Sequence, residues 1–251
     1  YMGKIGHDIA GKAILDDLHT NGVDTSLVGY SNNGFTTGFS CILLAPSGER
    51  TILSYRGASS HYTIDAQDFH DTIPEWIYLS SVEGNFELLE TIFSYAQKHG
   101  IKIAMNPGKK ELAAKGKLKK LIPQLTILSV NKEEMQMLYS GDTLEELVRA
   151  ANKDVHYVVV TDGPKGAVAA DRWHIVKAGM YENVPVIDRT GSGDAFCSGF
   201  TAMIAAKEPL EWAVTYASAN STSVVGKIGA KDGILHSEDI VHEMPLQVKE
   251  M

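Results

Sequence analysis

The sequence is poor in cysteine and short of positive charge. Its two cysteines, Cys41 and Cys197, lie far apart in segments of different character. They indicate neither a disulfide framework nor a paired metal site, so we expect a cytoplasmic protein. The formal net charge is −8, with 31 acidic against 23 basic residues. Proteins that grip phosphate backbones usually carry a basic face, so we expect no nucleic-acid partner.

Long apolar runs and several well-known catalytic motifs are also absent. No apolar run approaches the length of a membrane span, so we expect no membrane partner. The sequence has no Gly-x-x-x-x-Gly-Lys-Ser/Thr phosphate loop and no Gly-x-Ser-x-Gly nucleophile elbow. Its nine histidines are scattered, without the His-Glu-x-x-His or His-x-His grouping that binds zinc. These absences argue against P-loop, serine-hydrolase and zinc chemistry.

Strand-like and helix-like segments alternate from Trp76 onward. Hydrophobic residues make up 44% of the 251 residues, enough for one large domain with a small appendage. The predicted strands are 77–79, 101–105, 125–130 and 155–160, and the predicted helices between them are 86–98 and 132–139. The last of these strands is continuously apolar, as in a sheet buried on both faces. The pattern predicts a doubly wound, mostly parallel α/β sheet flanked by helices.

The remaining segments have a different texture. Apolar residues recur at helical spacing over His7–His19. Two β-rich runs flank Pro46–Glu49, which predicts a hairpin with a tight turn. These runs are 37–45 and 50–55. Near the other end we expect short antiparallel strands and then two helices, at 166–170, 173–176, about 194–206 and 210–225.

Three polar or glycine-rich segments follow predicted strands. They are Ser129–Glu134, Thr161–Gly166 and Asp188–Asp194. Ligands of doubly wound sheets bind beyond the carboxyl ends of the strands, so we expect the chemistry at these three segments.

The segment Asp188–Asp194 combines two glycines with a carboxylate at the start of a predicted helix. The glycines permit tight backbone geometry, so the amides of Gly191, Ser192 and Gly193 can converge on one anion at the positive end of the helix. Asp194 beside this anion hole can take the proton of an attacking hydroxyl. A hydroxyl, a base and an anion hole are the core requirements of phosphoryl transfer to an alcohol.

Two other interpretations of this turn are a helix N-cap and a dinucleotide-binding turn. Asp194 on its own fits a helix N-cap equally well, because aspartate is a favoured capping residue. The two glycines also resemble the start of a dinucleotide-binding turn. That interpretation fails because Phe196 occupies the third glycine position, the turn lies late in the chain, and a carboxylate inside it would repel a pyrophosphate.

The residues Asp-Arg-Thr-Gly-Ser-Gly-Asp-Ala-Phe at 188–196 resemble the C-terminal signature of the ribokinase-like (PfkB) carbohydrate kinases, Asp-Thr-x-Gly-Ala-Gly-Asp-x-Phe. Arg189 replaces the usual threonine, and Ser192 replaces the usual alanine. The serine keeps the backbone amide that an anion hole uses. The arginine, by contrast, would alter a nearby cation site. The resemblance covers nearly the whole chain and implies a ribokinase-like fold, ATP as the phosphate donor and Asp194 as the catalytic base.

The segment beginning at Asn131 resembles the Asn-x-x-Glu motif of the same family. The resemblance implies that Glu134 organises Mg²⁺ and its waters near the phosphates and that Asn131 faces the nucleotide. The residues alone fit a simple helix start as well, with Asn131 as the cap and Glu134 in the first turn.

Two further segments resemble the family's nucleotide site. Thr161, Gly163 and Gly166 match a Thr-x-Gly-x-x-Gly loop that runs along the ATP phosphates and ribose. A β-turn between two strands is the alternative for this loop. Asn220 lies in a small-residue helix that resembles the one beside adenine, and its alternative is a solvent-facing helix position.

The resemblance also implies a monovalent cation site. Asp188 and Thr190 would help to bind K⁺ together with carbonyl groups near residues 224–229, as in many members of the family. The alternative for Asp188 is a carboxylate that caps the turn.

The hairpin matches the family's lid, which covers the sugar and often mediates homodimer formation. Closure would exclude water from the reacting phosphate. Gly38, Phe39 and Arg56 are candidate substrate contacts, and a cationic fork at Arg56 would suit an acidic sugar. The alternative is that Phe39 packs on the hairpin and Arg56 is solvated.

The family's opening strand, which bears an acidic substrate-binding residue, and the Gly-Gly motif after it have no counterpart here. We therefore expect either a fragment or a numbering that begins inside a longer protein, with weak sugar binding and reduced stability. On this view residues 1–35 are a partial N-terminal part of the α/β core, 36–56 are a β lid, and 57–251 are the core with the nucleotide-binding C-terminal half.

The function predicted from the sequence is ATP-dependent transfer of the γ-phosphate to a hydroxyl of a sugar or sugar-like alcohol, with Mg²⁺ as a cofactor. The alternatives are a nucleoside kinase, a kinase of a sugar acid such as 2-keto-3-deoxygluconate, and a non-catalytic relative that binds a nucleotide or sugar.

Overall fold

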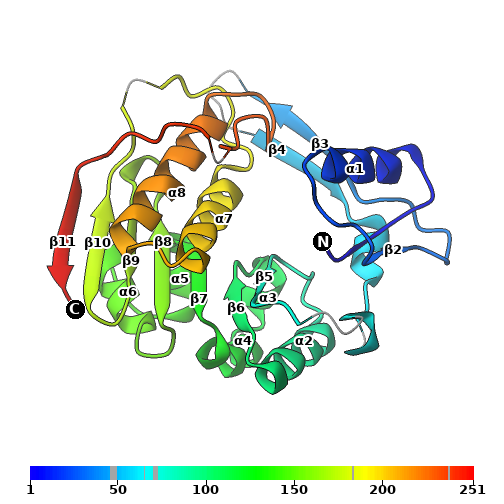
Figure 1. The fold of residues 1–251 in the computed structure, drawn as a ribbon, viewed down its shortest axis with the longest axis horizontal. Helices are drawn as coiled ribbons and strands as arrows, with labels where there is room; N and C mark the ends of the chain where they lie inside the picture. The colour runs from blue at the N-terminus through cyan, green and yellow to red at the C-terminus, as the bar shows by residue number, and fades with distance from the viewer. Residues whose placement is uncertain (46–49, 65, 70–72, 183, 237) are drawn as a thin grey trace.

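The computed structural model describes residues 1–45, 50–64, 66–69, 73–182, 184–236 and 238–251. Its main body is a seven-stranded sheet with helices on both faces, and a smaller N-terminal part lies to one side (Figure 1). Within the described residues, we find no helix with the length and apolar character needed to span a membrane.

The large sheet is mixed, in the order β11-β10-β9-β8-β7-β6-β5. Its strands are β5 Trp76–Leu79, β6 Lys102–Met105, β7 Ile127–Asn131, β8 Tyr157–Thr161, β9 Ala167–Ala170, β10 His174–Ala178 and β11 Leu246–Glu250. Strands β5 to β8 pair in parallel, and the pairs from β8 to β11 are antiparallel. The predicted α/β sheet is confirmed, and its parallel part ends at β8.

Helices cover both faces of this sheet. They are α2 Phe86–His99, α3 Lys109–Ala113, α4 Lys115–Leu121, α5 Lys132–Leu138, α6 Leu144–Ala151, α7 Ser192–Ala205 and α8 Leu210–Val225. Alternation along β8 shows why its sequence is apolar throughout: Val158 and Val160 belong to one hydrophobic cluster, and Val159 belongs to the cluster under α7 and α8. Both faces of the strand are buried, so no polar position remains.

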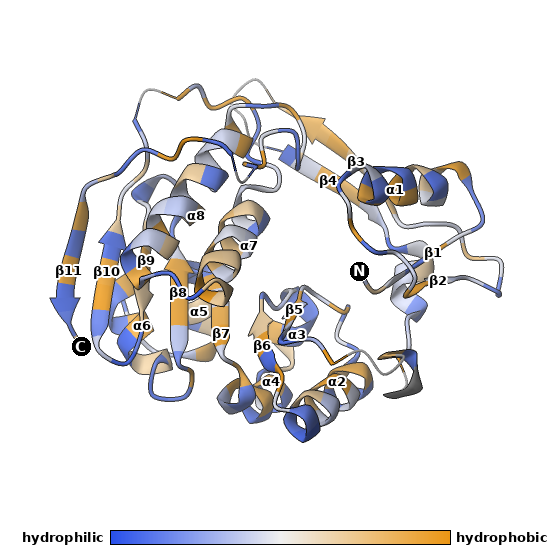
Figure 2. Cartoon of the chain, viewed as in Figure 1, coloured by the Kyte–Doolittle hydropathy of each residue, from blue (hydrophilic) through white to orange (hydrophobic). Residues whose placement is uncertain are grey.

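The hairpin consists of β3 Phe39–Leu44 and β4 Arg50–Tyr55, which pair antiparallel as the sequence predicts. The predicted turn Pro46–Glu49 lies outside the described residues. Every residue of both strands is exposed. Figure 2 shows apolar colour along this ribbon, which extends away from the large sheet.

The N-terminal part positions the hairpin. Strands β1 Gly3–Ile5 and β2 Val28–Tyr30 form a parallel pair of their own, and helix α1 spans Ile9–Thr20. Asp8 caps α1 through an Oδ1 bond from the amide of Gly11 at 2.8 Å. Its other oxygen accepts the amide of Thr37 at 2.7 Å, so one carboxylate fixes both the helix start and the base of the hairpin.

Candidate active site

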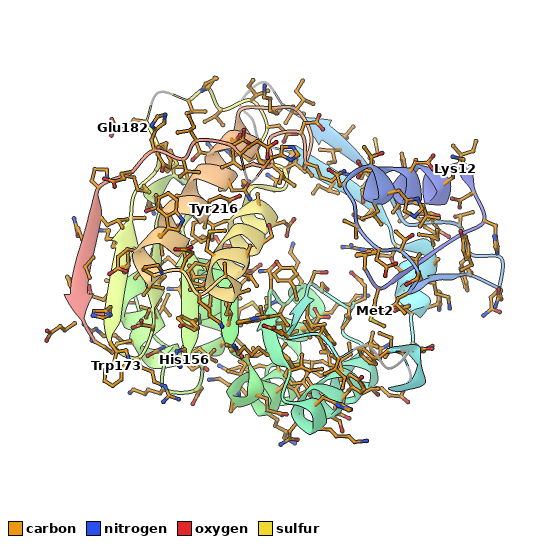
Figure 3. All side chains as sticks on the ribbon, in the orientation of Figure 1. Met2, Lys12, His156, Trp173, Glu182 and Tyr216 are labelled. Atoms are coloured by element: carbon orange, nitrogen blue, oxygen red, sulfur yellow. The ribbon has the colours of Figure 1, made fainter. Side chains whose placement is uncertain are left out.

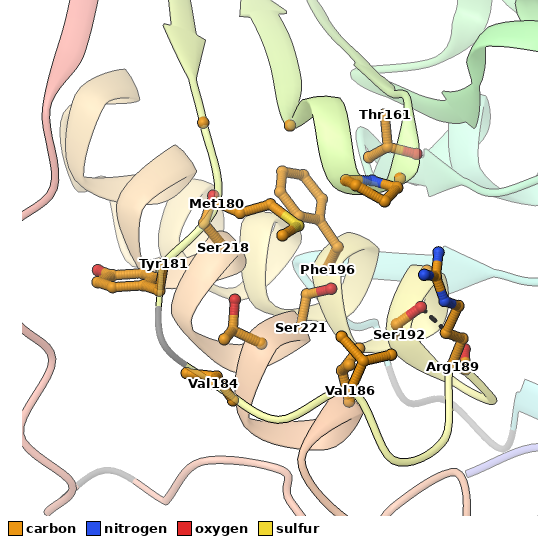
Figure 4. Close-up of a pocket in the computed structure, with 17 residues that line it drawn as sticks. Thr161, Met180, Tyr181, Val184, Val186, Arg189, Ser192, Phe196, Ser218 and Ser221 are labelled. Carbon is orange, nitrogen blue, oxygen red and sulfur yellow. Dashed lines mark hydrogen bonds between the residues drawn. The ribbon is translucent and has the colours of Figure 1, made fainter. Parts of the chain in front are cut away.

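A pocket lies at the carboxyl edge of the sheet, beyond β8 and β10. Figure 3 labels Glu182 at this end of the molecule and His156 and Trp173 at the opposite end. The loop after β8, the segment that follows β10, the start of α7 and one side of α8 line the pocket. Figure 4 shows Thr161 and Phe196 facing it from two of these elements. This is the edge at which the sequence predicts chemistry.

Gly191 turns the chain into α7. Its φ of 77° lies in the left-handed region, and a Cβ added to it would stand 2.4 Å from the carbonyl oxygen of Ala230. Only glycine satisfies both conditions. The amide of Ser192 donates to the carbonyl of Arg189 at 3.4 Å, whereas the amides of Gly191 and Gly193 donate to none of the described residues outside their helix. Free amides at a helix N-terminus are the donors that an anion hole needs.

Asp194 occupies the first turn of α7, but it is not the cap. The N-cap is Gly191, and no side chain caps the helix, so the capping interpretation of Asp194 is wrong. Neighbouring atoms desolvate the carboxylate and raise its pKa, although it keeps access to solvent. The charge of Arg50 on the hairpin partly offsets that rise. A carboxylate with a raised pKa next to free amides can accept a proton at neutral pH.

Cys197 and Tyr78 are two further titratable groups near Asp194. Cys197 is buried one turn further along α7, with its Sγ 2.7 Å from the Oγ of Ser129. Burial raises the pKa of this thiol to about 12. Burial also raises the pKa of Tyr78 on β5, and the charge of Asp194 adds to that effect. Both groups are neutral at physiological pH.

Asp188 is buried where the turn begins. Its Oδ1 accepts the amide of Thr190 at 2.8 Å, and its Oδ2 accepts the amide of Gly229 at 3.1 Å. Desolvation opposes ionisation of Asp188, but the bonds from Thr190 and Gly229 and the charge of Arg50 together lower its pKa. The carboxylate therefore stays charged and ties the turn to the chain that follows α8.

Asn131 and Glu134 form a reciprocal capping box at the start of α5. The Oδ1 of Asn131 accepts the amide of Glu134 at 2.9 Å, and the Oε2 of Glu134 accepts the amide of Asn131 at 3.0 Å. Burial raises the pKa of Glu134, while Lys109 lowers it and Asp194 raises it further. The two acids are thus electrostatic neighbours, although neither Asn131 nor Glu134 lines the pocket described above.

The loop after β8 lines the pocket with Thr161, Gly163 and Gly166. The two glycines have φ of 51° and 86°, and a Cβ at Gly166 would lie 2.1 Å from the carbonyl oxygen of Ala178. The glycines therefore allow the turn to close tightly against β10. The structure brings this loop and residues 189, 192 and 193 of the turn to the lining of one pocket.

Comparison with known proteins decides the family. The model of the pfkB family carbohydrate kinases matches residues 1–237. The chain belongs to the pfkB family. It is 25% identical to a ribokinase of Haemophilus influenzae over 244 residues, which cover 93% of this chain and 77% of the relative. It is 26% identical to an uncharacterised sugar kinase of Archaeoglobus fulgidus, covering 95% and 96% of the two chains.

The fold agrees with this assignment. An E. coli protein assigned as a ribokinase II and solved with ATP and Mg²⁺ superposes with a TM-score of 0.80 at 19% identity. The match covers 93% of this chain and 79% of that one. As a pfkB-family kinase, the protein transfers phosphate from ATP to a hydroxyl of a sugar or nucleoside.

In this pfkB-family kinase, Asn220 does not have the solvent-facing position that was the alternative for it. The side chain is buried at 3% exposure, its amide nitrogen donates to the carbonyl of Ala195 at 2.8 Å, and its oxygen accepts the amide of Leu235 at 2.9 Å. It does not line the pocket. Residues that sequence reasoning did not single out line it instead: Met180, Val184, Ser218, Ser221 and Thr222. The small side chains of α8 indicate the pocket in the sequence, because they leave room for a ligand beside the helix.

The predicted substrate residues lie at the base of the hairpin. A Cβ on Gly38 would meet the carbonyl oxygen of Arg56 at 2.8 Å, and Phe39 is 66% exposed. The Nε of Arg56 lies 3.1 Å from Oε1 of Glu83, which also pairs with Lys110 at 3.0 Å. The Nε of Arg56 is therefore engaged by Glu83, while the side chain is 59% exposed.

Proposed function

We propose that this kinase transfers the γ-phosphate of ATP to a neutral sugar-like alcohol, with Asp194 as the base. The observation that supports this most directly is the position of Asp194. It lies in the first turn of α7 with a raised pKa, beside the amides of Gly191 and Gly193, which have no acceptor among the described residues outside the helix. These are the base and the anion site that phosphoryl transfer to an alcohol requires.

In the reaction the substrate hydroxyl gives its proton to the Asp194 carboxylate as its oxygen attacks the γ-phosphorus. The bond from that phosphorus to the bridging oxygen breaks, and ADP leaves. The amides of Gly191 and Gly193, with that of Ser192, offset the charge on the transferring phosphoryl oxygens. The phosphates would lie along Thr161, Gly163 and Gly166, since this loop and the turn line the same pocket.

The acidic residues near the turn fit Mg²⁺ bound chiefly through ATP. No cluster of three or more metal-ligating side chains occurs among the described residues. Mg²⁺ usually binds through one or two carboxylates plus substrate phosphates, and Glu134, an electrostatic neighbour of Asp194, supplies one such group. When bound, the ion would neutralise phosphate charge. Asn131 would then serve mainly to hold Glu134 in place.

We also propose a monovalent cation beside Asp188 and Thr190. The Asp188 carboxylate is buried and its pKa is lowered, so it carries a fixed negative charge. Each of its oxygens accepts one amide and keeps a second lone pair for a cation.

The hairpin suits a homodimer interface. Leu43, Leu53 and Phe39 are more than half exposed on a two-stranded ribbon, and such ribbons are marginal without a partner. A second hairpin of the same kind has the matching apolar surface and strand edges. Light scattering that shows only monomers at micromolar concentration would contradict this proposal.

A release assay for ADP across a panel of sugars, sugar acids and nucleosides tests the main proposal. We expect turnover with a neutral sugar or nucleoside, because Glu83 already engages the Nε of Arg56 and offsets part of its charge. Preferred turnover of a sugar acid would contradict the substrate class. An absence of turnover with every acceptor, despite ATP binding, would contradict the reaction.

A further inference from the structure

Arg189 is the residue at which the turn departs most from the family signature, and its surroundings are unusual. The side chain is half-buried between Asp188 and the start of α7 and lines the pocket. Its Nε is fully buried and donates to no acceptor among the described residues. A buried guanidinium N–H without an acceptor is unfavourable, so the described residues alone leave this side chain incompletely satisfied.

The guanidinium is also unpaired with the carboxylates nearest to it in sequence, among the described residues. None of the ion pairs among the described residues involves Arg189, although Asp188 and Asp194 lie one and five positions away. The arginine whose charge lowers the pKa of both aspartates is Arg50 on the hairpin. Arg189 therefore keeps its positive charge uncompensated by these acids.

The side chain points toward the ligand space. Figure 4 shows Arg189 extending from the turn beside Ser192, in the direction of the loop that carries Thr161. Its own carbonyl is fixed because it accepts the hydroxyl of Ser192 at 2.9 Å and the amide of the same residue at 3.4 Å. The serine that replaces the usual alanine thus holds the backbone from which the guanidinium projects.

We propose that Arg189 is a phosphate-binding residue, which donates from its guanidinium to the polyphosphate of the nucleotide at the mouth of the anion hole. The inference rests on the proposed function, because it takes the pocket as the ATP site. A guanidinium binds phosphate oxygens through paired donors and carries a permanent charge. Arg189 and Ser192 would then act together, one holding the phosphate and the other holding the arginine.

The test compares nucleotides that differ only in phosphate. Calorimetric titration of the full chain with ADP, ATP and adenosine gives a phosphate-dependent affinity ratio for each variant. We expect Arg189→Gln to weaken ADP and ATP binding by about tenfold and to leave adenosine unchanged, because one charged hydrogen-bonding partner is lost. Arg189→Lys keeps the charge without the fork, so we expect a smaller loss.

Arg172→Gln is the matched control, since Arg172 is exposed on the turn between β9 and β10 at the far end of the sheet. Equal ADP affinity in the wild type and Arg189→Gln would overturn the role of Arg189 and leave the proposed function intact. Equal losses for ADP and adenosine would show a structural role and would also overturn it. A wild-type chain that binds no adenine nucleotide would overturn the proposed function itself.

If Arg189→Gln does not fold, the lysine variant decides the question. An Arg189→Lys chain that melts at the wild-type temperature and binds ADP and adenosine with the wild-type ratio in low salt and in 0.5 M NaCl would contradict the role. A lower ratio of ADP affinity to adenosine affinity in this variant, with a further fall in 0.5 M NaCl, would support the phosphate-binding role of Arg189. The reason is that salt screens a lone ammonium more easily than a guanidinium that binds phosphate through paired donors.

Discussion

The guanidinium of Arg56 lies 3.1 Å from the carboxylate of Glu83, and this pair joins the base of the hairpin to the loop after β5. Glu83 adopts a left-handed φ of 58°, and Lys110 holds the same carboxylate from the other side. The loop is held in turn by the buried Glu111, which accepts the amides of Val82 at 3.0 Å and Gly84 at 2.7 Å. The hairpin therefore rests on a rigid support.

Glu83→Gln should loosen this support with little loss of fold stability. The pair is partly exposed, so its removal should cost about 1 kcal/mol or less in the free energy of unfolding. A looser hairpin excludes water less well, so we expect ATP hydrolysis without an acceptor to rise relative to acceptor phosphorylation. Glu87→Gln on the exposed face of α2 is the control. An unchanged ratio of hydrolysis to transfer would show that Glu83 plays no part in closure.

Asp194→Asn should remove turnover and keep ATP binding. Loss of a positioned general base lowers rates by about 10²–10⁴-fold. The amide keeps the size of the side chain, and Gly191, the cap of α7, is untouched. Steady-state ADP release measures kcat, and calorimetry measures ATP affinity. A variant with more than a tenth of wild-type kcat would refute the role of Asp194.

The same substitution should stabilise the folded chain near neutral pH. The pKa of Asp194 is raised by desolvation, so its ionised form is less favourable in the folded state than in the unfolded state. Stability from this group is fully present below its unfolded pKa and is lost as the pH rises through its folded pKa. We expect the melting temperature of Asp194→Asn to exceed that of the wild type at pH 7 and the gap to shrink in acid. A lower melting temperature at pH 7 would contradict this.

The rate should depend on pH through the same carboxylate. As the pH falls through the raised pKa of Asp194, the base becomes protonated and kcat/KM should decline at a pH above the usual titration range of an aspartate. Arg50→Gln removes the charge that partly offsets the rise, so the decline should move to higher pH. The profile of ADP release from pH 4 to 9 tests both expectations, and identical profiles for the two chains would contradict the second.

Gly191→Ala should be much more harmful than an ordinary glycine substitution. The left-handed φ and the carbonyl oxygen of Ala230 both exclude a Cβ, so we expect a loss of at least about 1–2 kcal/mol in stability together with most activity. Gly116→Ala is the control, because no described atom lies within 4 Å of its added Cβ. Thermal melting of both variants measures the contrast, which equal melting temperatures would refute.

Much of this architecture could be predicted from local patterns. The helix over Leu210–Val225 has the predicted bounds, because an apolar face and flanking turn residues mark both ends. The start of α5 could also be predicted from the sequence, since Asn131 and Glu134 are three residues apart, as a capping box requires. The turn before Asp194 could be predicted because the backbone itself requires a glycine at Gly191.

Other features depend on contacts that no local pattern contains. Strand β11 pairs with β10, which lies some seventy residues earlier in the chain. Nearly all of β11 is exposed, so its sequence has only a weak hydrophobic pattern from which to predict a strand. Asn220 could not be assigned from its helix alone, since its burial comes from Ala195 and Leu235 in other segments. The pairing of Arg56 with Glu83 likewise depends on where the hairpin comes to rest.

The bond from the amide of Gly229 to Asp188, together with the close approach of Ala230 to Gly191, has a consequence for how the molecule opens. The Asp188–Asp194 turn and the chain after α8 are 41 residues apart at this bond, so movement of either one strains contacts of the other. We expect the two segments to open as one cooperative unit in native-state hydrogen exchange. Their amides should then exchange together, and an event that loosens the end of α8 should reach the amides of Gly191–Gly193 in the same step.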